Sequence, residues 1–480
     1  MTSDSETPIP EASPRRQSPP SRRLSFLNSP AVKFVLIGFV TLMLMIPSTF
    51  VWVLVEERAD RSREVAQDIA KSWGGTQEIN GPYLAVPFTE TFMDTDVDDK
   101  RVQKVVHRTA VLFPEKLDVT GDVSVEERKK SIYSLPVYNS SLNLKGRFSD
   151  FPENGFEPSH GGTIDILADK AVLVIGIGDV RALKSEVVLK MNGEQSLAFE
   201  PGLGPLVMNA SRYPGRAANP SGINVGVPQM KWRQGFAFDV PLQLNGSTAV
   251  YFAPAGQTTR VKLQSDWPHP GFTGAFLPET RAISDSGFDA QWTIPYLARG
   301  IPKVLTTSKL PLEDKLLGVK FVEPVNFYQT ISRSLKYAIG FISLTFLAVF
   351  VLEMRSGWQF HWIQYGLMGL ALIIFYVMLL AFAEHVGYGA AYLIAATAAT
   401  VLNAFYIGTS LKSRTAGMIM LAVLASIFGV LYALMREQDY ALLIGSVIAF
   451  VALAITMFVT QNIDWTGQGK AASDPSSEPA

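Results

Sequence analysis

The chain has 480 residues, enough for two or three domains, and its formal net charge of −1 gives no basic surface of the kind that nucleic-acid binding usually requires. It contains no cysteine, which excludes disulfide bonds, thiolate metal sites and cysteine nucleophiles. Hydrophobic residues make up 48% of the chain and charged residues 18%, a mixture that indicates a membrane part joined to a sizeable soluble part.

The N-terminal region reads as a polar tail followed by a membrane anchor. Residues 1–30 are rich in Pro, Ser and Arg and too poor in apolar residues to build a core, so we expect a disordered cytoplasmic tail. Residues 31–55 form an apolar run that Ser29 and Pro30 are suited to start, and Pro47 is expected to kink it. The alternative is a cleaved signal peptide. Its apolar region would span about 7–15 residues and end in small residues, whereas this run is longer and ends in Val-Leu-Val-Glu-Glu.

Beyond the anchor, residues 56–73 continue the helical pattern. Val65, Ile69 and Trp73 form one apolar stripe, and Gly74 with Gly75 follows as a stop signal. We expect a helical stem that rests one face on the domain behind it.

Residues 74–332 are predicted to form a large, mainly-β domain. Short stretches in which apolar and polar residues alternate are separated here by Gly and Pro, a pattern typical of strands. Asn192-Gly193 lies between two such strands and is a strong signal for a two-residue hairpin turn. A similar pattern recurs around Asn245-Gly246, so the two predicted hairpins are either an internal repeat or a chance similarity. A sandwich-like architecture follows from either interpretation.

The last third of the chain carries five apolar runs: residues 337–352, 363–383, 389–411, 416–434 and 440–460. Four of them reach the roughly 20 residues that a helix needs to cross a bilayer, and the first is slightly short. They predict a bundle of five transmembrane helices over residues 333–466 and a disordered cytoplasmic tail over 467–480. With the anchor, the fold class is a six-span α-helical membrane bundle with the β domain inserted between the first and second spans.

Basic residues near the spans set the expected orientation, because they are retained on the cytoplasmic side. With the N-terminus inside, the residues on that side are Arg15, Arg16, Arg22, Arg23, Lys33, Arg355, Lys412, Arg414 and Lys470. The short external loops between the later spans keep only Arg436. We therefore expect both termini in the cytoplasm and residues 74–332 on the opposite, periplasmic side.

Three polar residues in the predicted spans are candidate functional residues. Glu384 and His385 end the third span, where a carboxylate beside an imidazole can hold a proton or metal; the alternative is a polar pair that marks the helix end. Asn403 follows a stripe of small residues on the fourth span, a pattern more typical of helix packing than of transport. The spans place no charge near the bilayer centre, which argues against a proton-driven pump.

In the β domain, the segment 265–270 contains Trp267 and His269, with prolines on both sides of the histidine. The fixed backbone can present the indole and imidazole for recognition, or the segment can be a rigid structural turn with Trp267 in the core. No nucleophile–base–acid set is recognisable from residue spacing.

Several motifs along the chain carry a family resemblance: Glu57-Arg58-Ala59-Asp60-Arg61, Gly81-Pro82, Val125-Glu126-Glu127-Arg128-Lys129, Ser265-Asp266-Trp267-Pro268-His269-Pro270, Ser286-Gly287-Phe288, Lys336-Tyr337-Ala338-Ile339, Glu384-His385 and Asn462-Ile463-Asp464-Trp465. Over roughly residues 31–466 the chain resembles the CreD family of bacterial inner-membrane proteins, labelled cell envelope integrity proteins. The tail 1–30 is longer than the family's usual start. The resemblance implies a role in envelope maintenance or stress response, linked in some bacteria to a two-component system and to β-lactam response, and it supplies no catalytic residues.

The sequence therefore favours a non-enzymatic inner-membrane protein without a cofactor, whose periplasmic domain binds envelope proteins or cell-wall components while the bundle lies in the lipid bilayer. A lipid or small-molecule transporter with a groove between spans is the second hypothesis. The third is a membrane-bound cell-wall hydrolase acting through Glu384, His385 or His269.

Overall fold

The computed structural model describes residues 30–95, 99–150, 158–193, 195–206, 221–228, 233–306, 310–312, 314–322, 327–356, 359–436 and 441–461. The chain divides into two compact units, one helical (Met1–Arg58 with Phe327–Ala480) and one mainly β (Ala59–Asn326). The tails predicted at 1–30 and 467–480 lie outside the described residues, apart from Pro30 at the start of the first helix.

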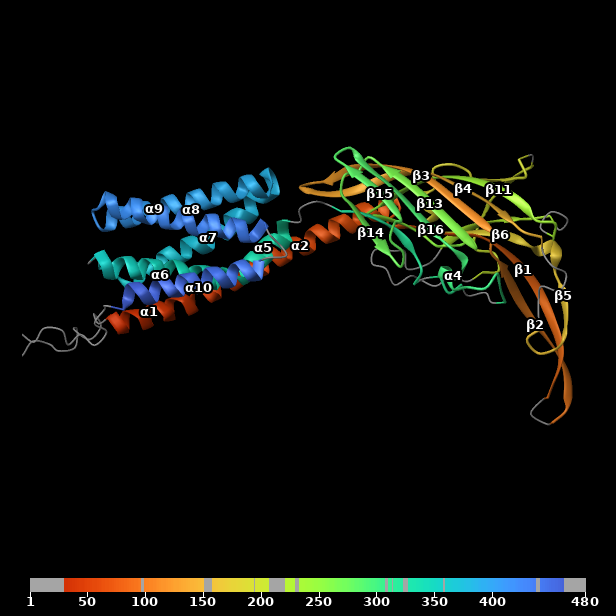
Figure 1. Ribbon diagram of the computed structural model, residues 1–480, viewed down its shortest axis with the longest axis horizontal. Coiled ribbons are helices and arrows are strands. Elements are labelled where there is room, and N and C mark those ends of the chain that lie inside the picture. Colours follow the sequence, from red (N-terminus) through yellow and green to blue (C-terminus); the bar gives the residue numbers. More distant parts are fainter. Residues whose placement is uncertain are drawn as a thin grey trace, which may run out of the picture. The chain divides into compact units, whose positions relative to one another are not determined.

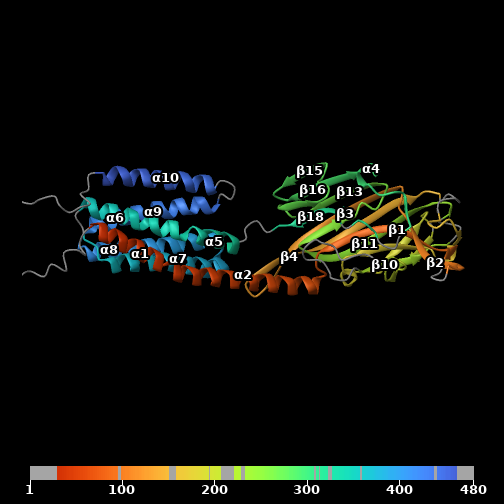
Figure 2. The same ribbon diagram turned by 90° about the horizontal axis from the view of Figure 1, so that it is seen from below.

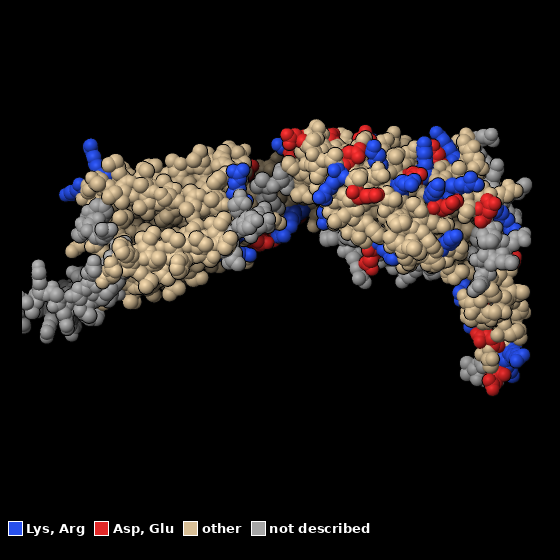
Figure 3. Space-filling model, in the orientation of Figure 1, with Lys and Arg blue, Asp and Glu red and all other residues tan. Residues whose placement is uncertain are grey.

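The helical unit is a bundle of helices, most of them long and apolar, that run side by side (Figures 1 and 2). Its helices are α1 (Pro30–Met43), α2 (Met45–Trp73), α5 (Phe327–Lys336), α6 (Ala338–Ser356), α7 (Trp362–Val386), α8 (Tyr388–Ser410), α9 (Arg414–Arg436) and α10 (Ala441–Thr460). The predicted run 31–55 covers α1 and the start of α2, and each of the other five runs coincides with one helix, from α6 to α10. On the face drawn in Figure 3, Lys and Arg lie at the two ends of this unit and the middle is uncharged.

Length and composition qualify four helices of the described chain as membrane spans: the continuous 42-residue helix over α1 and α2, α7, α8 and α9. The pair α5 and α6 adds a fifth if the two helices, bent by 54°, form one broken span. The described apolar part of α10, Leu443–Phe458, is shorter. The prediction of several spans is confirmed at this coarser level.

Small residues allow the helices of the bundle to approach closely. On α8, Ala391 and Ala395 are fully buried. Between α8 and α9, a Cβ built on Gly417 would lie 3.0 Å from the carbonyl oxygen of Ala404, and one on Gly369 of α7 would lie 2.2 Å from a methyl group of Leu44. Because helices in lipid associate largely through van der Waals packing, such positions determine which helices pair.

The β unit contains two sheets. The larger is a 10-stranded sheet in the described chain, and β1 lies at its centre, pairing with β2, β5, β6 and β12. Its strands are β1 (Gln77–Thr95), β2 (Arg101–Leu112), β5 (Thr163–Ile166), β6 (Val172–Ile177), β9 (Glu200–Pro201), β10 (Ser221–Gly226), β12 (Ala249–Phe252), β14 (Pro270–Gly274), β17 (Val304–Leu305) and β18 (Leu317–Phe321).

The second sheet has eight described strands in the order β15-β16-β13-β3-β4-β11-β7-β8. They are β3 (Lys116–Lys130), β4 (Tyr133–Phe148), β7 (Val188–Met191), β8 (Gln195–Ala198), β11 (Phe236–Ser247), β13 (Thr258–Ser265), β15 (Thr280–Ser284) and β16 (Gly287–Ile294). One hydrophobic cluster joins both sheets, with Val174 and Ile175 from the first and Leu142 and Leu242 from the second. The predicted mainly-β domain is thus confirmed.

The two Asn-Gly pairs have different structures. Asn192 and Gly193 take φ values of 49° and 80° and lie in the turn of the antiparallel β7–β8 hairpin. The predicted hairpin is confirmed, but Met191 pairs with Gln195, so its loop is one residue longer than the predicted two-residue turn. The hairpin predicted at Asn245-Gly246 is wrong: β11 pairs with β4 through this pair, and the chain turns at Thr248 (φ 65°) before β12 joins the other sheet. A Cβ on Gly246 would meet the Tyr138 ring at 2.3 Å, so this glycine accommodates a neighbouring side chain and makes no turn.

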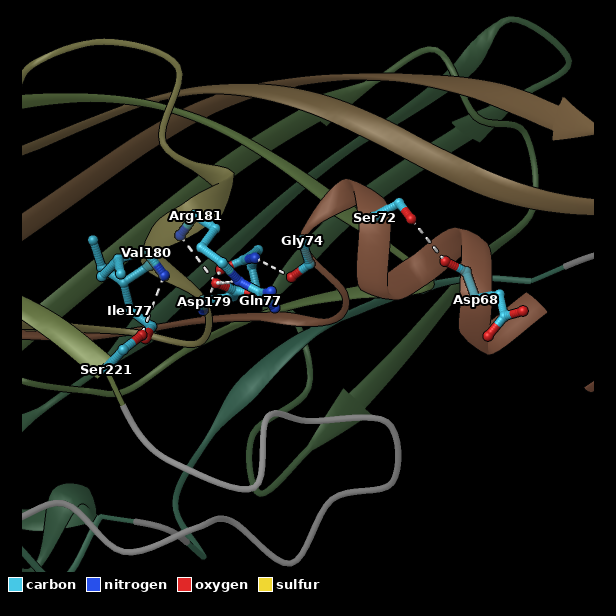
Figure 4. Close-up of polar contacts among 9 residues, drawn as sticks. All are labelled: Asp68, Ser72, Gly74, Gln77, Ile177, Asp179, Val180, Arg181 and Ser221. Carbon is cyan, nitrogen blue, oxygen red and sulfur yellow. Dashed lines mark hydrogen bonds and ion pairs between the residues drawn. The ribbon is translucent and has the colours of Figure 1, made fainter. Parts of the chain in front are cut away.

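The stem predicted at 56–73 is the C-terminal part of α2, which ends at Trp73 before Gly74 and Gly75, both at positive φ. In Figure 4, the fully buried Gln77 joins this end to the first sheet: its Nε2 donates to the Gly74 carbonyl at 2.5 Å and its Oε1 accepts from the Asp179 amide at 3.2 Å. Arg128 of the β3–β4 hairpin lies over the Trp73 ring, 4.2 Å from its centroid.

Candidate functional sites

Glu384, near the C-terminus of α7, is in contact with two other helices of the bundle. The Tyr328 hydroxyl of α5 donates to its Oε1 at 3.1 Å, and Arg58 Nη1 of α2 lies 3.9 Å from its Oε2. The Glu384 side chain is 8% exposed and that of Arg58 is 48% exposed, so the pair lies at the bundle's edge. The arrangement can tie α5 and α2 to the end of α7.

His385 does not share this site. It is exposed, while the adjacent Glu384 is directed to Tyr328 and Arg58. Within the described residues no group of three His, Cys, Asp or Glu side chains could hold a metal ion. Glu384 and His385 are therefore neighbours in the chain but do not form one site in the structure.

A second buried carboxylate, which sequence reasoning missed, lies towards the other end of the bundle. Glu353 of α6 is 1% exposed and forms an ion pair with Lys33 of α1. The Tyr365 hydroxyl donates to its Oε2 at 2.8 Å, and the backbone amide of Phe360 donates to its Oε1 at 2.7 Å. Charge and hydrogen bonds together compensate for removing this carboxylate from water.

The sequence does contain a signal for the pairing of Lys33 with Glu353. Lys33 is a lone cation at the start of the first apolar run, and Glu353 directly follows the run 337–352. The predicted orientation puts both residues at the cytoplasmic side. Opposite charges at one membrane depth are candidate partners, because an unpaired one is costly there.

Asn403, the third candidate in the spans, is 3% exposed on α8. Its Nδ2 donates to the Ala399 carbonyl of the same helix at 2.9 Å. This bond is a local contact within α8, whereas a bridge between helices would reach a second helix.

Trp267 and His269 belong to the segment through which the chain passes from β13 in one sheet to β14 in the other. Asp266 accepts hydrogen bonds from the Ser124 hydroxyl and the Val125 amide, both at 2.8 Å. The half-buried Trp267 donates from its indole nitrogen to the Val322 carbonyl at 3.2 Å. His269 has an exposed side chain, and its carbonyl accepts from the Val322 amide. These contacts fix the crossover and leave the imidazole as its accessible group.

A cluster of polar residues that the sequence did not single out lies where β1 and β2 leave the sheet. Glu90 of β1 is fully buried, and it accepts a hydrogen bond from the His160 amide at 2.6 Å. His160 Nδ1 lies 3.3 Å and Arg108 Nε 3.5 Å from the Glu90 carboxylate. Burial disfavours the charged carboxylate of Glu90. The hydrogen bonds from His160 and the charges of His160 and Arg108 outweigh this effect of burial, so the pKa of Glu90 lies below its ordinary value.

Beyond this cluster the β1–β2 hairpin forms an arm, defined as residues 91–95 and 99–107, which extends away from the sheets in Figure 1. Three of its aliphatic side chains are exposed: Met93 to 61%, Val102 to 40% and Val105 to 54%. Asp94 and Lys104 pair across it at 3.0 Å. On its outer side β2 pairs only with β17, at Val111 and Leu112, so among the described strands its edge over 101–110 has no partner.

A family model described as "Inner membrane protein CreD" matches residues 29–466. The chain belongs to the CreD family. The inner membrane protein CreD of Escherichia coli (strain K12) is 34% identical over 427 residues, which cover 88% of this chain and 91% of that protein. Among solved structures, an M1 zinc metallopeptidase of Deinococcus radiodurans has a TM-score of 0.21 and 9% identity over 73% of this chain and 93% of its own, too weak a likeness to carry an argument.

The CreD match includes every described helix and strand, so the helical and β units both belong to the family's architecture. Together with the apolar helices it makes this chain an inner membrane protein in contact with the lipid bilayer. The resemblance expected from the sequence is thus confirmed.

Proposed function

We propose that this CreD-family protein supports cell envelope integrity through a periplasmic β unit that binds an envelope component, with no catalytic step of its own. The family assignment supports the setting in the inner membrane. The arm is the observation that carries the binding role. Sheet edges in soluble proteins are usually covered, charged or short, because an open edge pairs with other chains.

The partner we propose is an extended segment of an envelope protein. Such a segment can add to β2 as a further strand, with backbone hydrogen bonds to the open edge and side-chain contacts to Val102 and Val105. Charged groups also lie at the arm (Figure 3), and the Asp94–Lys104 ion pair joins its two strands. Such charges contribute more to the choice of partner than to the affinity of binding.

The proposed topology has six spans with both termini in the cytoplasm. The α5–α6 pair supplies one span, crossed mainly by the 19-residue α6, and the 20-residue α10 is the sixth. The basic residues Lys33, Lys412 and Arg414 support this orientation, since the positive-inside rule retains them in the cytoplasm. The β unit, which follows α2 and precedes α5 in the chain, then lies in the periplasm.

Complementation of a deletion strain tests the binding role. We expect the intact gene to restore retention of a periplasmic marker enzyme under β-lactam stress, and the double variant Val102→Asp with Val105→Asp to fail. Ile283→Asp is the matched control, because Ile283 is 52% exposed on β15, an edge strand of the other sheet. If the arm variant, present in the membrane at the same level as the unmodified protein, fully restored marker retention, the arm would not be the binding site. A deletion strain that did not leak the marker enzyme would contradict the envelope role.

A further inference from the structure

Two apolar grooves in the helical unit meet at Lys336. The first, of about 490 Å³, lies between α6, α9 and α10 and is lined by residues such as Leu344, Leu347, Leu431 and Leu453. The second, of about 380 Å³, lies between the α1–α2 helix and the start of α6 and is lined by Leu44, Met45, Trp52 and Ile342 among others. Lys336 and Ile339 line both grooves.

Lys336 is an exposed cation at the point where α5 ends and the chain bends into α6. In the described part of the chain no carboxylate forms an ion pair with it. Tyr337 beside it is 51% exposed, and Trp52 in the second groove is 42% exposed. Tyr and Trp concentrate at the level of the lipid head groups, so these rings indicate that Lys336 reaches that level.

A cation at head-group depth above two apolar grooves matches the chemistry of one diacyl phospholipid with an anionic head group. We propose that this site binds such a lipid, with one acyl chain in each groove and the phosphate at the Lys336 ammonium. The apolar lining suits acyl chains, and because no described carboxylate pairs with Lys336, its charge is available to a phosphate. This lipid site involves neither the arm nor its envelope partner, so it is independent of the proposed binding role of the β unit.

Two glycines in the first groove make the acyl-chain position testable. A Cβ built on Gly340 of α6 or Gly445 of α10 would meet no atom within 4 Å. A leucine at either position therefore extends into the groove and takes the place of the acyl chain without displacing protein atoms. Gly38 on α1 is equally open and lines neither groove, so Gly38→Leu is the matched control.

The experiment uses the full chain in phosphatidylcholine vesicles that contain a trace of nitroxide-labelled lipid. Electron paramagnetic resonance measures how much of the label is immobilised by the protein. We expect labelled phosphatidylglycerol to be retained about fivefold more than labelled phosphatidylcholine. This factor corresponds to the attraction of about 1 kcal/mol between one basic residue and an anionic lipid. Lys336→Gln should remove this preference, whereas Arg436→Gln, which changes an exposed cation at the end of α9, should keep it.

Gly340→Leu and Gly445→Leu should each lower the immobilised phosphatidylglycerol, and Gly38→Leu should not. Thermal unfolding of each variant shows that the bundle is intact. Equal retention of the two labelled lipids by the unmodified chain would overturn the proposal. So would an equal loss in Lys336→Gln and Arg436→Gln, or full retention in both groove-filling variants.

Discussion

Lys33 and Glu353 show how a charge is tolerated within the apolar bundle. The Glu353 carboxylate has a cation, a hydroxyl and a backbone amide as partners, so no lone charge remains buried. Glu384 has Tyr328 and Arg58 but is more accessible. We therefore interpret Glu353 as a clamp between α1 and α6, and Glu384 as the better candidate for a functional carboxylate.

The clamp predicts a specific pattern of stability. Lys33→Met leaves Glu353 buried without its cation and should lower the free energy of unfolding by about 3 kcal/mol. Adding Glu353→Gln removes the charge but keeps an acceptor, and should recover most of the loss. Denaturant titration in mixed micelles measures both, with Arg414→Met, an exposed cation at the start of α9, as control. A loss no larger than that of Arg414→Met would exclude the clamp.

Glu90 predicts a pH-dependent stability of the β unit. Its folded-state pKa is lowered, so its contribution is fully present above the pKa of the unfolded chain and is lost as pH falls through the folded-state value. Glu90→Gln should therefore increase hydrogen exchange of the His160 amide at pH 7, and the difference from the unmodified chain should shrink in acid. An effect of the substitution that grew as pH fell would contradict this sign.

At the scale of elements, the apolar runs located the membrane helices because a bilayer demands length and composition that few other structures share. The start of α7 shows a further local signal, a capping box in which His361 Nδ1 accepts from the Ile363 amide and Gln364 caps the His361 amide. The two Asn-Gly pairs show the limit of local signals. Asn192-Gly193 turns and Asn245-Gly246 does not, because the Tyr138 ring on β4 needs the space at Gly246.

The candidate sites were less accessible to sequence reasoning. Glu384 was found as an ionisable residue at a span end, but its partners Tyr328 and Arg58 are distant in the sequence. The Glu90 cluster depends on a pairing between β1 and β2 and on the segment before β5, which no local spacing encodes. Trp267 was recognised by its unusual neighbours, and its hydrogen bond to Val322 required the sheet topology.

Close packing of α8 on α9 gives a prediction at the same scale. Gly417→Leu should push the Ala404 carbonyl away and cost about 1–3 kcal/mol, because a well-packed contact must open. Gly429→Leu is the control on the same helix, since a Cβ there would meet nothing within 4 Å. Thermal unfolding in detergent compares the two variants. Equal midpoints would mean that α8 and α9 are not in close contact at Gly417.

At the scale of the whole molecule, the proposed function depends on how the chain is partitioned between membrane and water. The apolar helices favour lipid, the basic residues favour the cytoplasm, and the β unit has its own core and a charged surface. Envelope binding requires that the β unit lie outside the cytoplasm. The lipid site requires only that the bundle be inserted with Lys336 at the head-group level.

The most direct test labels single cysteines, for which the cysteine-free chain provides a clean background. Each variant is exposed to an impermeant thiol reagent in cells whose inner membrane is intact, and again after permeabilisation. We predict that Ser159→Cys is labelled in intact cells, whereas Ser413→Cys and Gln461→Cys, after α8 and α10, are labelled only after permeabilisation. Labelling of Gln461→Cys in intact cells, or protection of Ser159→Cys until permeabilisation, would contradict the six-span topology with a periplasmic β unit.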